Sequence, residues 1–252
     1  MEKKEQKLKE YEDTINRLLR NMSHQITRPI LELKQAAYIF SSHGFSPEAY
    51  KYFKVALAEI ERGIRNFNVY TMLTTDFQKT VSRDIIQSNF DLSEILKNAI
   101  DRIRPYLEVD QRKININAKG TLLPKISGNA SAFTECLVNV FHNAIKYSLG
   151  GRPIEVEIDY IKSRKQVEMR VSNYGIELNK EYWEEIFKPA NRTETTKILS
   201  IEGSGLRLFI SRKSLELNNS IIKVESCIPC EPTQDGNKRF RTTFLISIPR
   251  GT

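Results

Sequence analysis

Apolar residues recur every three or four positions over the first 40 residues of the chain. They are Leu8, Tyr11, Ile15, Leu18 and Met22, followed by Ile26, Ile30, Leu33 and Ala37. Steps of three and four are typical of a coiled-coil seam, in which one stripe of a helix packs against a partner. The sequence therefore predicts a long helix that needs a partner, with a kink at Pro29.

A second amphipathic helix is predicted after a cluster of helix-breaking residues at 41–47. Ser46 suits the N-cap position and Pro47 the first helical position. One face of this helix carries Phe53, Ala56, Ile60, Ile64, Phe67 and Thr71. Two such helices joined by a short turn form an antiparallel hairpin. Because one hairpin cannot bury both apolar faces, we expect it to pair with a second copy as a four-helix bundle.

The rest of the chain alternates between helical and strand patterns. We expect helices near 91–107, 131–147 and 204–217, and strands near 114–118, 154–160, 167–172, 221–225 and 243–248. This alternation, with helices on one side, describes a two-layer α/β sandwich. The predicted fold class is α+β, with a helical hairpin over 1–78, a linker over 79–90 and a sandwich domain over 91–252.

Composition limits the classes of function. The chain has 252 residues and a formal net charge of +8, but its basic residues are dispersed. We interpret the excess as solvated surface, biased toward an acidic partner or nucleotide phosphates, and expect no nucleic-acid partner. No run of about 18 apolar residues occurs, so no membrane span is expected within this sequence. We expect a cytoplasmic location, with a membrane anchor upstream if Met1 is not the native start.

The three cysteines do not form a disulfide framework. Cys227 and Cys230 make a single C-x-x-C, and a structural zinc site needs about four ligands. We expect this pair to lie in a loop before the last strand. Cys136 lies in an apolar helix and is expected in the core.

The helix predicted near 131–147 carries the most informative polar residues. Glu135, Asn139, Asn143 and Lys146 recur at spacings of four, four and three, so they share one face. Asparagine costs roughly 0.6 kcal/mol relative to alanine inside a helix, and a merely solvated face would favour other residues. The alternative is that amide oxygens ligate Mg²⁺ and the lysine contacts a phosphate. Spacing alone leaves both interpretations open.

Two glycine-containing segments are further candidates. Asn173 and Gly175 follow a predicted strand, where a polar acceptor beside a glycine can hold a ligand close to the backbone. Residues 203–206 (Gly-Ser-Gly-Leu) open a predicted helix, where backbone N–H groups can face an anion. A flexible helix cap is the alternative for this second segment.

Taken in order, these segments resemble the motif boxes of sensor histidine kinases and related GHKL-type ATPases. Residues 139–148 are similar to the N box, 171–178 to the G1 box, 184–192 to the F box and 203–208 to the G2 box. Upstream, residues 22–30 resemble the H box, with His24 five residues before Pro29. The resemblance covers nearly the whole chain and implies a HisKA-type hairpin followed by a GHKL-type HATPase domain.

The resemblance also implies the site residues, with ATP and Mg²⁺ as cofactors. Asn143 would coordinate Mg²⁺, with Asn139 as a second candidate, and residues 191–203 would form a mobile lid. Lys146 would contact phosphate, Tyr147 would pack on the adenine and Asn173 would face its amine. The residues implied to contact ATP are Asn139, Asn143, Lys146, Tyr147, Asn173, Gly175, Arg192, Gly203, Ser204, Gly205 and Leu206.

The activity implied is that of a histidine autokinase. His24 would accept the γ-phosphoryl group, with Gln25 as the adjacent catalytic position, and would pass it to an aspartate of a response-regulator receiver domain. An imidazole suits this chemistry, which depends mostly on positioning and charge stabilisation. The protein would work as a homodimer through the hairpin. His43 and His142 are expected to be surface or packing residues.

Several positions depart from the family pattern. Gln25 replaces the usual acid, and an amide can orient an imidazole but cannot accept its proton. Arg28 stands where kinases that also dephosphorylate their partner often have Thr or Asn. Asn173 replaces the G1 aspartate and Glu177 the second G1 glycine. Arg207 replaces a G2 glycine, where its guanidinium would either crowd the site or pair with a phosphate.

Two alternatives to an active autokinase remain open, and the departures motivate the first of them. The first is a degenerate kinase that acts as a nucleotide-binding signalling scaffold. The second is another GHKL-type enzyme, such as a serine kinase or an ATPase, although His24 on a coiled-coil hairpin argues against it.

Overall fold

The computed structural model describes residues 33, 35, 47–74, 88–119, 125–149, 151–188, 207–216, 218–232, 236 and 238–250. Predictions that fall outside these ranges concern His24, Gln25, Arg28, Pro29, His43, Arg192, Gly203, Ser204, Gly205 and Leu206. Almost all of the first predicted hairpin helix also lies outside them.

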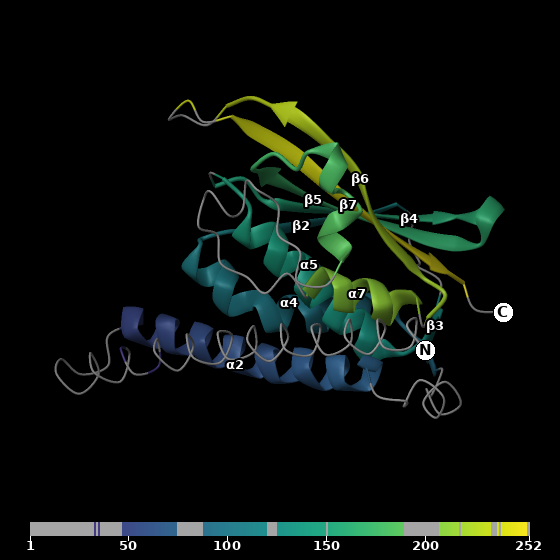
Figure 1. Ribbon diagram of the computed structural model, residues 1–252, viewed down its shortest axis with the longest axis horizontal. Coiled ribbons are helices and arrows are strands. Elements are labelled where there is room, and N and C mark those ends of the chain that lie inside the picture. Colours follow the sequence, from purple (N-terminus) through teal and green to yellow (C-terminus); the bar gives the residue numbers. More distant parts are fainter. Residues whose placement is uncertain are drawn as a thin grey trace, which may run out of the picture.

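A five-stranded mixed sheet forms the centre of the structure (Figure 1). Its strands, in spatial order, are β2 (Ile114–Lys119), β4 (Ile154–Ile161), β5 (Gln166–Gly175), β7 (Arg239–Pro249) and β6 (Ile221–Cys230). Strand β2 runs parallel to β4, and the other neighbours are antiparallel. Two short strands, β1 (Ser88–Phe90) and β3 (Ile126–Gly128), form a separate antiparallel pair.

Three helices cover one face of this sheet. They are α4 (Leu92–Val109), α5 (Ala130–Lys146) and α7 (Arg207–Glu216). Short 3-10 turns at Lys162–Arg164, Lys180–Tyr182 and Glu185–Phe187 connect the other elements. Helix α2 (Pro47–Thr74) packs on α4 and α7, on the side of the helical layer away from the sheet (Figure 1).

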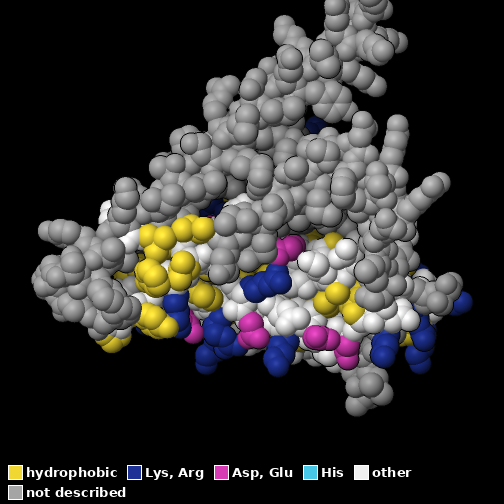
Figure 2. Space-filling view, turned by 90° about the horizontal axis from the view of Figure 1, so that it is seen from below, with side chains coloured by type: hydrophobic (Ala, Val, Ile, Leu, Met, Phe, Trp, Pro, Cys, Tyr) yellow, Lys and Arg dark blue, Asp and Glu magenta, His cyan; other side chains and the backbone are white. Residues whose placement is uncertain are grey.

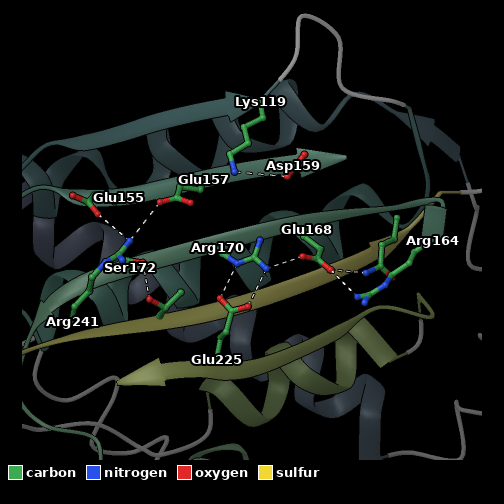
Figure 3. Close-up of polar contacts among 12 residues, drawn as sticks. Lys119, Glu155, Glu157, Asp159, Arg164, Glu168, Arg170, Ser172, Glu225 and Arg241 are labelled. Carbon is green, nitrogen blue, oxygen red and sulfur yellow. Dashed lines mark hydrogen bonds and ion pairs between the residues drawn. The ribbon is translucent and has the colours of Figure 1, made fainter. Parts of the chain in front are cut away.

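Apolar and charged residues alternate along the strands, and this explains why the helices cover only one face of the sheet. In β5, Val167, Met169 and Val171 are at most 1% exposed and join the core with residues of α4 and α5. The intervening Glu168 and Arg170 point to the other face, where charged side chains pair across strands (Figure 3). Arg170 binds Glu225 of β6 at 2.8 Å. A sheet with one apolar and one charged face buries only the apolar face, and this gives a two-layer sandwich.

The α+β fold class with a mixed sheet is therefore confirmed. Helix α2 begins at Pro47, as predicted. Helix α4 begins at the N-cap Asp91, whose side chain accepts a hydrogen bond from the Ser93 amide at 2.9 Å. Strand β1 lies inside the range that was expected to be a linker. The sequence did not predict this strand, because three residues are too few to show the alternation of a strand.

Strands β6 and β7 are longer than the sequence predicts. Both extend beyond the expected ranges, and Cys227 and Cys230 lie in β6 rather than in a loop. The loop assignment of the C-x-x-C pair was therefore wrong, and Pro229 between the two cysteines does not end the strand. Strand β6 lies at the edge of the sheet, where a proline is tolerated, and β7 pairs with it as far as Cys230.

None of the described helices is both long and apolar enough to span a membrane.

Candidate functional site

Helix α5 is the centre of the candidate site, and its local sequence fixes both ends. Asn129 caps the N-terminus by accepting a hydrogen bond from the Ala132 amide at 3.0 Å. Tyr147 follows the last turn, and its amide donates to the Asn143 carbonyl at 3.0 Å. Phe141, which is fully buried, anchors the helix in the core. The rotation of α5, and so the direction of its polar stripe, is therefore fixed.

Three of the four residues in the polar stripe of α5 are buried, which excludes the interpretation of a merely solvated face. Glu135 is 5% exposed and pairs with Arg102 of α4. Asn139 is fully buried, and its Nδ2 donates to the Ser211 hydroxyl of α7 at 3.3 Å. Asn143 is also buried. The first two residues of the stripe therefore join α5 to α4 and α7.

Two amide oxygens in this stripe lack partners in the described part of the chain. Asn139 Oδ1 is buried without a hydrogen bond, and the Asn143 side chain makes no hydrogen bond to any described residue. The two residues are one helical turn apart on the same face. A buried acceptor left unsatisfied costs about 1–3 kcal/mol, and amide oxygens are ligands of a kind that Mg²⁺ accepts. These residues fit the expected metal.

Lys146 and Tyr147 end the helix and are partly exposed. The Lys146 ammonium lies 5.5 Å from the centroid of the Tyr147 ring. A cation and an aromatic ring together at the C-terminal end of the stripe have the chemistry to contact a phosphate and a flat apolar base, respectively.

The end of β5 meets the end of α5 through backbone hydrogen bonds. The Leu149 amide donates to the Tyr174 carbonyl at 2.8 Å, and the Ile176 amide donates to the Tyr147 carbonyl at 3.2 Å. A Cβ atom on Gly175 would lie 1.7 Å from the Tyr147 carbonyl oxygen. Gly175 is therefore required here, because a side chain would collide with the backbone of Tyr147. This contact joins the segment that resembles the G1 box to the segment that resembles the N box.

Asn173 lies two residues before this junction. It shares the helix-covered face of β5 with Val171, and it is 5% exposed. Its side chain makes no hydrogen bond to a described residue, although neighbouring Ser172 pairs with Thr243 at 2.9 Å. A buried amide without a protein partner is available to bind a ligand.

Residues 184–188, which are the described part of the segment that resembles the F box, pack against α7. Phe187 is 2% exposed, and its ring meets that of Phe244 edge-on with 6.4 Å between centroids. The Arg212 guanidinium stacks 4.0 Å from the centroid of the Phe187 ring and binds Glu184 at 2.8 Å. This segment holds α7 in place beside α5.

Arg207, the first residue of α7, contacts the α2 side of the molecule. Its Nη1 lies 2.8 Å from His142 Nδ1, and its Nη2 lies 3.7 Å from a carboxylate oxygen of Glu59. Burial and the charge of Arg62 lower the pKa of Arg207 to about 10, so it remains a cation at neutral pH. Sequence reasoning missed Glu59 and expected His142 to be a surface or packing residue. The only available signal was the replacement of a G2 glycine by Arg207.

Part of the chain matches a known protein family, and most of it matches known relatives. Residues 128–251 match the family described as "Histidine kinase-, DNA gyrase B-, and HSP90-like ATPase". The sensor protein RprX of Bacteroides fragilis is 22% identical over 236 residues, which are 93% of this chain and 43% of that protein. The histidine protein kinase SaeS of Staphylococcus aureus is 24% identical over 219 residues, which are 84% of this chain and 60% of that protein. The chain thus spans about half the length of these relatives.

Solved structures show the same fold. The histidine kinase ThkA, in complex with the response regulator protein TrrA, aligns with a TM-score of 0.56 at 18% identity. The alignment covers 99% of this chain and 66% of that chain.

Proposed function

We propose that this chain, whose residues 128–251 form a histidine kinase-, DNA gyrase B- and HSP90-like ATPase domain, is the transmitter part of a sensor histidine kinase. It would use ATP to phosphorylate His24. The observation that carries the proposal is the pair Asn139 and Asn143, whose amide oxygens are unpartnered in the described chain. The names of RprX and SaeS, a sensor protein and a histidine protein kinase, support it.

The residues of α5 and β5 would bind the nucleotide together with Mg²⁺. Asn143 would hold the metal, with Asn139 as a second ligand, and Lys146 would contact a phosphate. Tyr147 would pack on the adenine, and the Asn173 carbonyl would accept from the adenine amine. A neutral acceptor forms a hydrogen bond roughly half as strong as a charged one. The bound metal would neutralise charge that develops on the phosphoryl group.

Residues outside the described ranges would complete the ATP site. Arg192 and the segment 203–206 would belong to the lid and its hinge. The junction of Gly175 with Tyr147 supports a site of fixed shape at the base of this lid, because it ties the two ligand-bearing segments together.

Phosphoryl transfer would begin with a ring nitrogen of His24. This nitrogen would attack the γ-phosphorus of ATP as the bond from that phosphorus to the bridging oxygen of ADP breaks. Gln25 could orient the ring but not accept its proton, so the proton would pass to solvent. The phosphoryl group would then move to an aspartate of a response-regulator receiver domain. The ThkA complex, whose title names a response regulator, supports this class of partner.

Helix α2 would be the second helix of a dimerising hairpin. Tyr50, Tyr52 and Leu57 are 46%, 60% and 40% exposed on this helix. Figure 2 shows hydrophobic side chains gathered over the first half of α2, on the face of the molecule away from the sheet. Apolar area of this kind supports burial against a second copy in a four-helix bundle. We also propose a cytoplasmic location for the domain.

An assay with γ-labelled ATP and Mg²⁺ tests the proposal. The chain should acquire an acid-labile, alkali-stable label that is absent from His24→Ala. Absence of label at every Mg²⁺ and ATP concentration would refute the autokinase.

The alternative is a degenerate kinase that binds nucleotide as a scaffold. The neutral Asn173 in place of an acid favours it. Calorimetry with ATP and Mg²⁺ separates the two functions, because tight binding without any label on His24 would support the scaffold.

A further inference from the structure

Five residues from four helices form a largely buried polar group between α2 and the ATPase domain, here called the Glu59 cluster. It consists of Glu59 and Arg62 of α2, Tyr106 of α4, His142 of α5 and Arg207 of α7. Arg62 pairs with Glu59 and is 1% exposed. The His142 ring meets the Tyr106 ring edge-on at 4.8 Å between centroids. The Arg62 guanidinium lies 5.4 Å from the centroid of the same Tyr106 ring.

The hydrogen bonds fix the state of His142. A guanidinium can only donate, so Nδ1 accepts from Arg207 at 2.8 Å and carries no proton. Nε2 therefore carries the proton and donates to Glu59 at 3.2 Å. Burial and the charges of Arg62 and Arg207 hold the pKa of His142 well below its usual range, which agrees with this neutral tautomer.

The Glu59 carboxylate is the one negative charge in the Glu59 cluster. Burial would raise the pKa of Glu59, but the hydrogen bond from His142 and the charges of Arg62 and Arg207 lower it overall. Glu59 is therefore an anion that faces two guanidinium cations, while His142 is neutral. Loss of this one charge would leave two buried cations without a counter-ion, which is strongly unfavourable.

We infer that Glu59, His142 and Arg207 form a docking latch that fixes α2 against the ATPase domain, with Arg207 as a docking residue rather than a phosphate ligand. The latch explains the arginine in the G2-like segment, where the resemblance leads one to expect a glycine. It joins α2 to His142, which immediately precedes Asn143 on α5, and to Arg207, the first residue of α7. It therefore connects the position of α2 to the helix that carries the proposed metal ligands.

The inference rests on the proposed function only where ATP is named as the ligand of the site. Docking itself is independent of nucleotide. It can be measured by hydrogen–deuterium exchange of the α2 amides over 55–63 in the full chain, because amides of a docked helix exchange slowly.

Glu59→Gln keeps the size of the side chain and removes its charge. We expect the α2 amides to exchange at least about tenfold faster in this variant. Arg207→Gln alone should have a smaller effect, because Arg62 still neutralises Glu59. In the double variant Glu59→Gln with Arg207→Gln, only Arg62 is left as an uncompensated cation. The α2 amides should therefore exchange at a rate closer to that of the wild type. The matched control is Lys54→Gln, which removes the exposed contact of Lys54 with Glu108 of α4 at 3.9 Å and should change exchange little.

Calorimetric titration of the same variants with ATP and Mg²⁺ tests the role of Arg207. The affinity of Arg207→Gln should stay within about threefold of wild type, whereas loss of a phosphate ligand would weaken binding tenfold or more. The latch would be refuted if Glu59→Gln left the α2 exchange rate unchanged, or if the double variant exchanged faster than Glu59→Gln. Selective loss of ATP affinity in Arg207→Gln would refute its assignment as a docking residue. If the wild-type chain bound no ATP, the proposed function would fail while the exchange data still decided the latch.

Discussion

Gly175 lies so close to Tyr147 that a Cβ atom on the glycine would be 1.7 Å from the tyrosine carbonyl oxygen. This approach joins the end of β5 to the end of α5, and those two ends carry Asn173 and Lys146. The shape of the candidate site therefore depends on a contact between backbones.

The first prediction concerns this contact. Gly175→Ala should force the two backbones apart and weaken the hydrogen bond from the Leu149 amide to the Tyr174 carbonyl. We expect the free energy of unfolding in urea to fall by about 1–3 kcal/mol, together with weaker ATP binding. Gly151→Ala is the matched control, since a Cβ atom there would meet nothing within 4 Å. Equal stability of the two variants would contradict the explanation.

The second prediction concerns the metal. Asn143→Ala should make ATP binding insensitive to Mg²⁺, because it removes a proposed oxygen ligand. Calorimetry with and without Mg²⁺ measures this, and we expect Mg²⁺–ATP affinity to drop by about tenfold or more. Asn115→Ala, at an exposed site on β2, should retain the wild-type Mg²⁺ dependence. A Mg²⁺ response that survived in Asn143→Ala would remove this residue from the metal site.

The third prediction concerns pH. The groups that face His142 are Glu59, Arg62, Tyr106 and Arg207, and its pKa in the folded chain lies well below the ordinary 6.5. Below about pH 6.5 the unfolded chain therefore binds a proton that the folded chain excludes. Stability should fall as pH drops below about 6.5, at up to about 1.4 kcal/mol per pH unit from this residue.

Urea unfolding between pH 7.5 and 5.5 measures this slope. His142→Gln should reduce it, and His43→Gln is the control for histidine replacement in general. An unchanged slope in His142→Gln would show that the residue is not held neutral in the fold.

The fourth prediction concerns Phe187, in the segment that resembles the F box. Phe187 is buried, and its ring contacts Phe244 and the Arg212 guanidinium. Phe187→Ala should cost about 3–5 kcal/mol of stability through the cavity that it leaves. Phe187→Leu, which keeps most of the apolar volume, should cost much less, and thermal unfolding compares the two. If both variants unfolded at the wild-type temperature, Phe187 would not anchor α7.

The elements with regular local patterns could be predicted from the sequence. The start of α2 at Pro47, the helix that carries Asn139 and Asn143, and the strands of the central sheet follow from periodicity and capping. Elements without such a pattern were missed or shortened. Strand β1 has three residues, and the second half of β6 contains Pro229.

The sequence by itself therefore determined the helices and strands that have a regular local pattern, and it placed the polar stripe on one face of α5, because these depend on residues a few positions apart. Only the tertiary structure decided what each member of the stripe does. Glu135 pairs with Arg102, and Asn139 meets Ser211, which lies 72 residues away. His142 pairs with Glu59 across 83 residues, although the sequence led us to expect a surface or packing residue. Such partners are set by how distant elements pack, and no local spacing in the sequence carries that information.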